Sequence, residues 1–348
     1  MRANARGERV RLVQVGWDAD LVHEFCDDPL PSLSGAEVLV EVEACGVCHR
    51  DLIDRAGRWP FLRVPITPGH EAAGRVVAVG PAVQQFRSGD RVATMHRDAC
   101  GECAACQRGE TSLCEGAAWV FGIMADGGYA RHVIAPESSL YRLPPAMPAT
   151  EAAIMHCTFG TAYRDLKTLG KIAAGERVLV TGANGGVGLA AVQIAARLGA
   201  EVVAVVRSAE HSALLSRLGA HQVIVDAGST FHEQSAAAGI DLVLEAVGHS
   251  TFASSLRTLR LGGRMVVVGN IVPERVLLNL GALITRGLSL IGGSGATRTD
   301  MAELLALHEA KAFTVAIDRV LPLSQADAAQ RFVRAGGLKG RIVLVPSG

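Results

Sequence analysis

The sequence predicts an α/β protein that combines a β-rich first part with a doubly wound parallel sheet. Three features of its 348 residues support this prediction. Short alternating apolar segments, separated by glycine and proline, fill the first part up to about residue 150. Beyond it, strand-like and helix-like segments alternate at the spacing of βαβ units. A glycine-rich turn joins the first strand of this second part to its first helix.

The first part reads as a set of short strands. In the segment EVLVEVEAC, Val38, Val40, Val42 and Ala44 lie on one face, and the other face carries Glu41, Glu43 and Cys45. The segments 72–80 and 90–95 have a similar character, and each lies near a glycine or proline. We therefore expect an irregular, mostly β domain.

The second part alternates apolar strands with helices. The expected strands cover residues 177–180, 201–206, 222–225, 241–248 and 264–270. The expected helices cover residues 185–200, 210–220 and 251–260. This alternation predicts a parallel sheet wound in both directions from its centre.

The last segment holds two helical patterns and a final strand, RIVLV, at 341–345. A lone strand needs pairing partners, and the β-rich part offers them. We therefore expect residues 1–158 to form one domain, completed by residues 297–348. Residues 159–296 should form the second domain.

Charge and hydropathy exclude several classes of protein. Lysine plus arginine and aspartate plus glutamate both number 34, so no net field attracts nucleic acid or an anionic membrane. The polar start lacks the apolar core of a signal peptide, and no apolar run approaches about 18 residues. We expect a cytoplasmic protein that acts on a small molecule, without a nucleic-acid or membrane partner.

The glycine-rich turn ANGGVG lies between a strand and a helix. Small residues there let the backbone turn tightly, approach a pyrophosphate and direct the helix N-terminus at it. An ordinary strand–helix turn is the alternative, but the flanking segments favour dinucleotide binding. The candidate cofactor-binding residues are Gly185, Gly186, Val187 and Gly188.

The end of the second strand indicates which dinucleotide is preferred. NAD-binding proteins usually carry an acid there for the ribose hydroxyls, whereas this chain has Val206, followed by Arg207 and Ser208. A guanidinium and a hydroxyl can bind a 2′-phosphate, which a carboxylate would repel. We therefore expect a preference for NADP(H). If Arg207 is only a solvated surface residue, the protein takes NAD(H) as well.

Four cysteines cluster in the segment CGECAACQRGETSLC. Four thiolates suit a tetrahedral zinc ion and leave no open position, which is typical of a structural site. An iron–sulfur cluster uses the same number of ligands and is the alternative. The four are Cys100, Cys103, Cys106 and Cys114.

A second metal site is expected from residues that lie far apart in the sequence. A catalytic zinc ion needs about three protein ligands and one open position, and Cys48, His70 and Cys157 supply them. A fourth ligand from Cys45 would close the site. Cys45 precedes a glycine at a strand end, where a small apolar residue often packs, so we leave it unligated. The two sites together give two zinc ions per chain.

The chain resembles the zinc-dependent medium-chain alcohol dehydrogenases, part of the medium-chain dehydrogenase/reductase superfamily. The resemblance runs nearly end to end. It rests on the segments GVCHRD, GHEAAG, GGYARHV, CTFGTAY, GANGGVG and GRIVLV, together with the four-cysteine segment. It implies a GroES-like catalytic domain and a Rossmann cofactor domain, with a catalytic zinc ion on Cys48, His70 and Cys157.

The resemblance also implies roles for five further residues. Asp51 matches a carboxylate that holds the ring of the histidine ligand, and Glu71 matches an acid near the metal. His49 and Arg341 match positions that contact the cofactor pyrophosphate, and Thr161 matches one near the nicotinamide. Arg341 on a last strand has a second interpretation, as a surface charge.

Arg50 departs from the family pattern. Relatives usually have serine or threonine there, and often a histidine where this chain has Ile53, to pass a proton away from the metal. Arginine stays protonated and cannot act as a general base. Trp59 matches a substrate-pocket aromatic residue of relatives, and Trp119 and Phe121 are candidates for the same cleft or for core packing.

These observations predict an NADP(H)-dependent, zinc-dependent alcohol dehydrogenase that works as an aldehyde or ketone reductase. An alternative is an NADPH-dependent reductase of activated C=C bonds in enones or enoyl thioesters, which does not need the missing proton relay. A non-catalytic, crystallin-like NADPH-binding protein is a third hypothesis. The segment 286–295 is an apolar strand at the place where relatives pair their edges across a two-fold axis, so the resemblance implies a homodimer or homotetramer.

Overall fold

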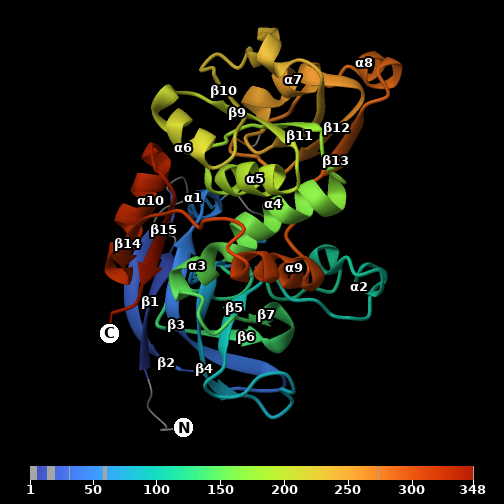
Figure 1. Cartoon of the computed structure of the whole chain (residues 1–348). Helices are drawn as coiled ribbons and strands as arrows, with labels where there is room; N and C mark the ends of the chain where they lie inside the picture. Colours follow the sequence, from blue (N-terminus) through green and yellow to red (C-terminus); the bar gives the residue numbers. More distant parts are fainter. Residues whose placement is uncertain (1–5, 14–19, 31, 58–60, 273, 348) are drawn as a thin grey trace. The chain divides into compact units, whose positions relative to one another are not determined.

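The computed structural model describes residues 6–13, 20–30, 32–57, 61–272 and 274–347, and the chain forms two compact units (Figure 1). The first unit comprises Met1–Cys157 with Ile317–Gly348, and the second comprises Thr158–Ala316. The chain thus returns to the first unit at Ile317, later than the predicted residue 297. The helix that follows residue 297 belongs to the second unit, where its Asp300 pairs with Arg164 and Thr168. No helix among the described residues is long and apolar enough to span a membrane.

The first unit is built on a largely antiparallel sheet of order β14-β15-β3-β4-β5-β7, with β6 paired to β3 and a separate β1–β2 hairpin. The strands are β1 (Arg6–Val13), β2 (Val22–Pro29), β3 (Glu37–Val47), β4 (Ala72–Val79), β5 (Arg91–Thr94), β6 (His132–Pro136), β7 (Leu140–Arg142), β14 (Ile317–Pro322) and β15 (Arg341–Val345). The helices are α1 (His49–Arg55), α2 (Ala104–Gln107), α3 (Ala149–Ile154) and α10 (Ala326–Ala335).

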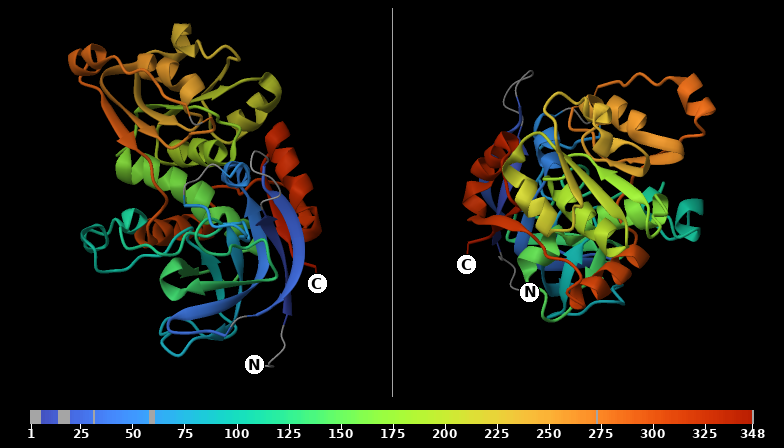
Figure 2. Two further views of the ribbon diagram at one scale, coloured as in Figure 1. Left: turned by 180° about the vertical axis from the view of Figure 1, so that it is seen from behind. Right: turned by 45° about the horizontal axis from the view of Figure 1, so that its top comes forward.

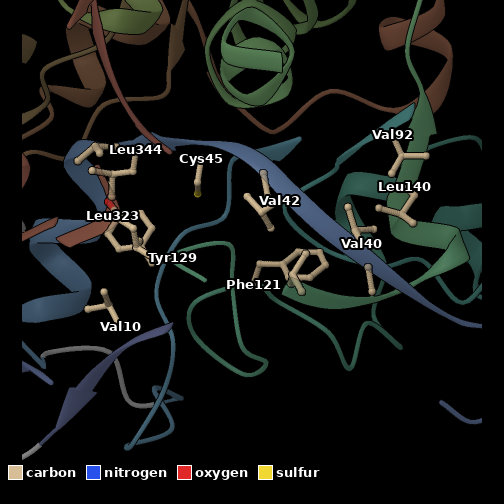
Figure 3. Close-up of a cluster of buried hydrophobic side chains, with 14 of the residues drawn as sticks. Val10, Val40, Val42, Cys45, Val92, Phe121, Tyr129, Leu140, Leu323 and Leu344 are labelled. Carbon is tan, nitrogen blue, oxygen red and sulfur yellow. The ribbon is translucent and has the colours of Figure 1, made fainter. Parts of the chain in front are cut away.

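The core of this unit lies against β3. Val38, Val40 and Val42 are at most 3% exposed, as their alternation predicted, and Tyr129 and Phe121 pack in the same cluster (Figure 3). The final strand β15 pairs with β3, so the expected return of the tail to the β-rich part is observed. Its backbone groups find partners there that a lone strand would lack.

The second unit carries a six-stranded parallel sheet of order β10-β9-β8-β11-β12-β13. The strands are β8 (Arg177–Val180), β9 (Glu201–Val206), β10 (Gln222–Val225), β11 (Ile240–Glu245), β12 (Leu259–Val267) and β13 (Ser289–Gly292). The helices are α4 (Thr161–Tyr163), α5 (Gly186–Arg197), α6 (Ser212–Arg217), α7 (His249–Thr258), α8 (Leu280–Thr285) and α9 (Arg298–Glu309). The predicted doubly wound sheet is confirmed, although β12 begins at Leu259 and takes two residues that the sequence assigned to a helix.

The direction of winding reverses between β8 and β11. From β8 the chain moves outward through β9 to β10, and from β11 it moves the other way through β12 to β13. Right-handed crossovers in opposite directions place α5 and α7 on opposite faces of the sheet (Figure 1), and Figure 2 shows the same ribbon from two further sides. The carboxyl ends of β8 and β11 therefore flank the switch point, where ligands of such sheets bind.

One long helical segment leads from the first unit into the second. It continues from α3 through a π-helical stretch, Met155–Gly160, and α4 to a second such stretch, Arg164–Leu169. Wide turns of this kind often mark functional sites because they displace side chains from the regular helical positions. Cys157 lies in the first of the two stretches.

Candidate metal centre and dinucleotide site

Three segments of the first unit bring four metal-ligating side chains together. Cys48 precedes α1, His70 and Glu71 precede β4, and Cys157 comes from the π-helical stretch. One ligand atom of each residue lies within 4.8 Å of the others. This set, called the metal group below, contains the three ligands predicted from the sequence and adds Glu71 to them.

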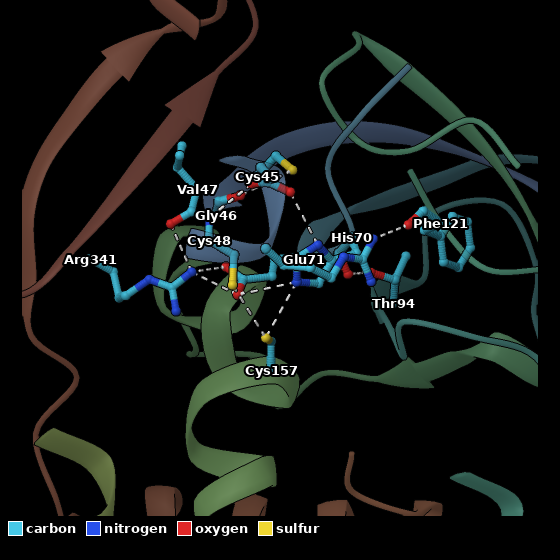
Figure 4. A network of polar contacts seen from close by, with 12 residues as sticks. Cys45, Gly46, Val47, Cys48, His70, Glu71, Thr94, Phe121, Cys157 and Arg341 are labelled. Atoms are coloured by element: carbon cyan, nitrogen blue, oxygen red, sulfur yellow. Dashed lines mark hydrogen bonds and ion pairs between the residues drawn. The ribbon is translucent and has the colours of Figure 1, made fainter. Parts of the chain in front are cut away.

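The spacing within the metal group suits tetrahedral coordination (Figure 4). The Sγ atoms of Cys48 and Cys157 are 4.0 Å apart, and His70 Nε2 lies 3.4 Å from Cys157 Sγ. Zn–S bonds of about 2.3 Å in a tetrahedron separate two sulfurs by roughly 3.8 Å and a sulfur from a histidine nitrogen by slightly less. The residues present therefore fit a zinc ion with an open fourth position.

Asp51 orients the histidine of the metal group. Its Oδ1 lies 3.3 Å from His70 Nδ1, while its Oδ2 accepts hydrogen bonds from the backbone N–H of Cys48 and from the Tyr129 hydroxyl, both at 2.9 Å. Asp51 is fully buried. This carboxylate therefore fixes the ring so that Nε2 faces the two cysteines.

The electrostatics of the metal group favour one thiolate. A hydrogen bond from Cys157 holds the pKa of Cys48 well below its usual range, against the effect of burial, and His70 adds to the shift. The same bond, followed by burial, raises the pKa of Cys157 well above its usual range. Burial and the Arg50 charge oppose protonation of His70, but Asp51 and Cys48 outweigh them and raise its pKa to about 9.

Arg341 is paired with the acid of the metal group. Its Nη2 donates to both carboxylate oxygens of Glu71, at 2.7 and 2.6 Å, and to the carbonyl of Val47 at 2.9 Å. Arg341 is only 9% exposed, so its interpretation as a surface charge is wrong. Burial raises the pKa of Glu71, although the Arg341 charge opposes the shift. The sequence did not predict this ion pair.

Arg50 is held by two contacts beside the metal group. Its Nε lies 3.1 Å from Asp54 Oδ2, and its Nη2 donates to the carbonyl of Phe121 at 2.6 Å. Burial disfavours its charge, but the carboxylates of Asp54 and Asp51 outweigh burial and raise its pKa. Arg50 is therefore a fixed positive charge beside the metal group.

Cys45 lies apart from the metal group. Its side chain is 1% exposed within the hydrophobic cluster, where its thiol lies 3.7 Å from the carbonyl of Gly46, and burial raises its pKa. Trp59 lies outside the described residues. Trp119 packs edge-on against the buried Phe121 and lines a cavity of about 520 Å³ to which none of the four metal-group residues contributes. The described part of the chain thus gives Trp119 a packing role.

The four clustered cysteines form a second group around α2. Their Sγ atoms lie within 4.8 Å of one another, with single separations of 3.5, 3.9 and 4.0 Å, again close to tetrahedral spacing. Backbone N–H groups of Cys106 and Glu115 lower the pKa of Cys103 to about 6. All eight cysteines lie in the described residues and none forms a disulfide, so these thiols are available to a metal.

The glycine-rich turn joins β8 to α5 in the second unit. Gly185 precedes the first helical residue, Gly186. A Cβ on Gly188 would lie 2.3 Å from the carbonyl oxygen of Gly182, so only glycine lets the helix start this close to the turn. Gly182 itself adopts φ +55°, a conformation that favours glycine, and the sequence reasoning did not single it out.

The other predicted cofactor residues lie in separate places. Arg207 and Ser208 are exposed directly after β9, and Arg207 forms no hydrogen bond or ion pair with a described residue. Thr161 begins α4 and is 8% exposed, while His49 begins α1 in the first unit. Sequence reasoning missed Glu245, a fully buried acid at the carboxyl end of β11. An acid that ends a strand of a parallel sheet was the available signal.

Two family descriptions match the chain: "Alcohol dehydrogenase GroES-like domain" over residues 34–145 and "Zinc-binding dehydrogenase" over residues 186–310. An acryloyl-coenzyme A reductase of Sulfurisphaera tokodaii is 32% identical over 93% of this chain and 96% of its own length. An alcohol dehydrogenase of Geobacillus stearothermophilus is 35% identical, over 90% and 93% of the two chains. The crystal structure of AibC is 39% identical and covers 100% of this chain and 97% of its own, with a TM-score of 0.91.

Metal analysis should find two zinc ions per chain, because the metal group and the four clustered cysteines both have tetrahedral spacing. Cys103→Ser should lower the content to one and reduce the melting temperature by on the order of 5–10 °C, since a four-ligand structural site contributes to folding. Cys48→Ser should also lower the content to one, with a smaller loss of stability.

Two other cysteines provide the controls. Two zinc ions should remain in Cys26→Ser, on the β1–β2 hairpin, and in Cys45→Ala, in the core. Neither thiol belongs to the metal group or to the four clustered cysteines. A wild-type protein with a single zinc ion that Cys48→Ser does not remove would contradict zinc binding by the metal group.

Proposed function

Starting from the fact that this chain belongs to the zinc-type medium-chain dehydrogenase/reductase family, we propose that it reduces an activated C=C bond conjugated to a thioester carbonyl, with NADPH as reductant. Arg50 carries this proposal. It replaces the hydroxyl that would protonate an alkoxide, and it is fixed by Asp54 and the Phe121 carbonyl. The likeness to an acryloyl-coenzyme A reductase over nearly the whole chain supports the same substrate class.

The chemistry explains why the relay hydroxyl is dispensable in this reaction. When a carbonyl is reduced, the oxygen becomes an alkoxide and needs a proton delivered to it. When a conjugated C=C bond is reduced, the β-carbon accepts hydride, the π electrons move to the carbonyl oxygen, and the α-carbon takes a proton from water. The product is the saturated thioester. Arg50 supplies a permanent positive charge for the oxygen on which negative charge develops.

The metal group would serve this reaction by holding zinc on Cys48, His70 and Cys157. A zinc ion there supplies Lewis-acid polarisation of the carbonyl oxygen. Asp51 keeps the His70 ring in place, and Arg341 neutralises Glu71, so that this acid does not occupy the open position. The remaining chemistry belongs to the bound substrate and the dinucleotide.

Carbonyl reduction, as in an alcohol dehydrogenase, is the second candidate. Its support is the ligand set itself, which fits a zinc ion with an open position, and the 35% identity to an alcohol dehydrogenase. The missing relay at Arg50 and Ile53 argues against it. A non-catalytic dinucleotide-binding role is disfavoured because the complete metal group would then have no use.

A substrate panel with Arg50 variants tests the proposed reaction. The wild type should oxidise NADPH with an enoyl-CoA at a kcat/KM well above that with the matching aldehyde. Arg50→Ser should lower enoyl-CoA turnover by about tenfold to a hundredfold, the loss expected for one charge-assisted hydrogen bond, and should not lower aldehyde turnover.

The controls separate the charge from the fold. Burial raises the pKa of Asp54 to about 6 even beside Arg50, so Arg50→Ser/Asp54→Asn removes the orphaned carboxyl and tests the charge alone. Arg63→Ser, an exposed arginine outside the metal group, should leave both activities unchanged. A wild type that reduces aldehydes but no enone or enoyl-CoA would refute the proposal.

Preference for NADPH is supported by the end of β9. Val206 is buried and offers no carboxylate, while Arg207 and Ser208 are exposed beside it. The Arg207 guanidinium is not engaged by another described residue, so it is available to a 2′-phosphate. A chain in which Arg207 only faces solvent would accept both dinucleotides equally.

Arg207→Ala should therefore lower kcat/KM for NADPH and leave kcat/KM for NADH unchanged. One charge-assisted phosphate contact is worth about 1.5–3 kcal/mol, so kcat/KM for NADPH should fall by about tenfold to a hundredfold. Arg217→Ala, an exposed arginine on α6, is the matched control and should change neither value. Equal losses for both dinucleotides, or a wild-type preference for NADH, would contradict phosphate recognition.

The second unit also carries features of a self-association surface. Strand β13 is an edge of the parallel sheet, and the nearby side chains of Leu277, Leu280 and Ile284 are 98%, 62% and 76% exposed. An edge strand has unpaired backbone groups, and these lie beside exposed apolar side chains. Pairing with the same edge of a second chain across a two-fold axis would hydrogen-bond the backbone groups and bury the apolar side chains. We infer a homo-oligomer joined through this edge.

Light scattering after size exclusion should give the mass of a dimer or tetramer. Leu277→Glu/Ile284→Glu should reduce the mass to that of one chain, because a buried charge destabilises an apolar interface. Leu113→Glu, 54% exposed in the first unit, should leave the mass unchanged. A wild type that stays monomeric at all concentrations tested would exclude the interface.

A further inference from the structure

We propose that Glu245 is a positioning residue that sets the shape of the dinucleotide-binding edge of the parallel sheet. The inference rests on the proposed use of a nicotinamide dinucleotide. It concerns a residue that touches neither the reacting atoms nor the glycine-rich turn predicted from the sequence. Its basis is the set of hydrogen bonds that the buried carboxylate accepts at the switch point.

Glu245 is fully buried and accepts hydrogen bonds from five groups. Its Oε1 accepts from the hydroxyls of Thr181 and Thr251, at 2.8 and 2.6 Å, and from the backbone N–H groups of Val247 and Gly248, both at 3.0 Å. Its Oε2 accepts from the hydroxyl of Ser255. Burial of a carboxyl group costs free energy unless its oxygens are hydrogen-bonded, and both oxygens of Glu245 are paired here.

These bonds join the two strands that flank the switch point. Thr181 follows the last residue of β8, and Glu245 is the last residue of β11. The Thr181 hydroxyl also accepts from the backbone N–H of Ala246 at 2.9 Å. Ligands of doubly wound sheets bind outside the carboxyl ends at this point. The carboxylate therefore fixes the two chain segments that lie closest to a bound dinucleotide.

The same network reaches the glycine-rich turn. Gly182, which immediately precedes that turn, would place a Cβ 2.9 Å from Cγ2 of Val247, so the two turns are in close contact. Gly248 adopts φ +105°, and its N–H is held by Glu245. A Cβ on Gly269, after β12, would lie 2.0 Å from the carbonyl carbon of Ala246. Displacement of residues 246–248 would therefore disturb the whole edge.

Asp241 provides an internal comparison at the opposite end of the same strand. Its Oδ2 accepts from the backbone N–H of Arg177 at 2.8 Å, so it also ties β11 to β8, and its Oδ1 pairs with Arg260. It lies at the amino edge of the sheet, where no dinucleotide binds. Loss of Asp241 should thus destabilise the unit without changing dinucleotide affinity.

Two substitutions separate the position of the carboxylate from its charge. Glu245→Gln keeps the length, and its amide nitrogen can face the Ser255 hydroxyl, which can turn to accept. Glu245→Asp keeps the charge but withdraws the oxygens by roughly 1.5 Å, one C–C bond, from Val247 and Gly248. If Glu245 sets the shape of this edge, Glu245→Asp should bind NADPH weakly and Glu245→Gln should bind it nearly as well as the wild type.

The experiment measures NADPH binding to purified protein by fluorescence titration, alongside melting temperature. Glu245→Asp should raise the Kd by about tenfold or more, and Glu245→Gln by less than about threefold. Asp241→Ala should lower the melting temperature at least as much as Glu245→Asp and leave the Kd unchanged. Amide hydrogen exchange should quicken at residues 182–188 and 246–248 in Glu245→Asp, and not at the amino edge.

Different outcomes overturn different claims. A Kd for Glu245→Asp within twofold of wild type, or an equal loss in Asp241→Ala, overturns the positioning role and leaves the proposed function standing. Unchanged amide exchange at residues 246–248 in Glu245→Asp also overturns the positioning role, and this measurement needs no cofactor. A wild type that binds neither NADPH nor NADH overturns the proposed function and the positioning role together.

Discussion

The pairing of β3 with β15 on one side and β4 on the other is the constraint on which the metal group depends. The register pairs Val47 with Ile342 and Cys45 with Ala72. It therefore brings together Cys48 after one strand, His70 and Glu71 before another, and Arg341 at the start of the third. These ionisable side chains are largely withdrawn from water, so each needs a partner from a neighbouring strand or a metal. A shift in register would separate every pair.

The sequence predicted those parts of the site that depend on residue type. Cysteine and histidine are recognisable as ligands. The metal group and the set of four clustered cysteines together contain all seven residues proposed for zinc. The ion pair of Arg341 with Glu71 was beyond prediction, because it depends on which strands are neighbours. Glu245 was missed because the sequence does not show which hydrogen-bond donors surround an acid at the end of an apolar strand. The return of the chain at Ile317 depends on how α9 packs, which periodicity does not encode.

The two units divide the chemistry between them. In the proposed function, the metal group and Arg50 of the first unit would act on a carbonyl oxygen. The glycine-rich turn and the Glu245 network of the second unit would shape the proposed dinucleotide site. Both rely on buried carboxylates that do not react: Asp51 holds a ligand ring and Glu245 holds two turns. Such groups stabilise one geometry because the loss of a single partner leaves a buried charge uncompensated.

The position of the transferred hydride distinguishes reduction of a C=C bond from reduction of a carbonyl group. NADPH deuterated at the transferable position of the nicotinamide should be incubated with an enoyl-CoA and with the matching aldehyde, and the products read by NMR. We predict deuterium on the β-carbon of a saturated thioester, with the second hydrogen on the α-carbon coming from solvent. Deuterium at the carbonyl carbon of an alcohol product, with the C=C bond of the enoyl-CoA intact, would contradict it.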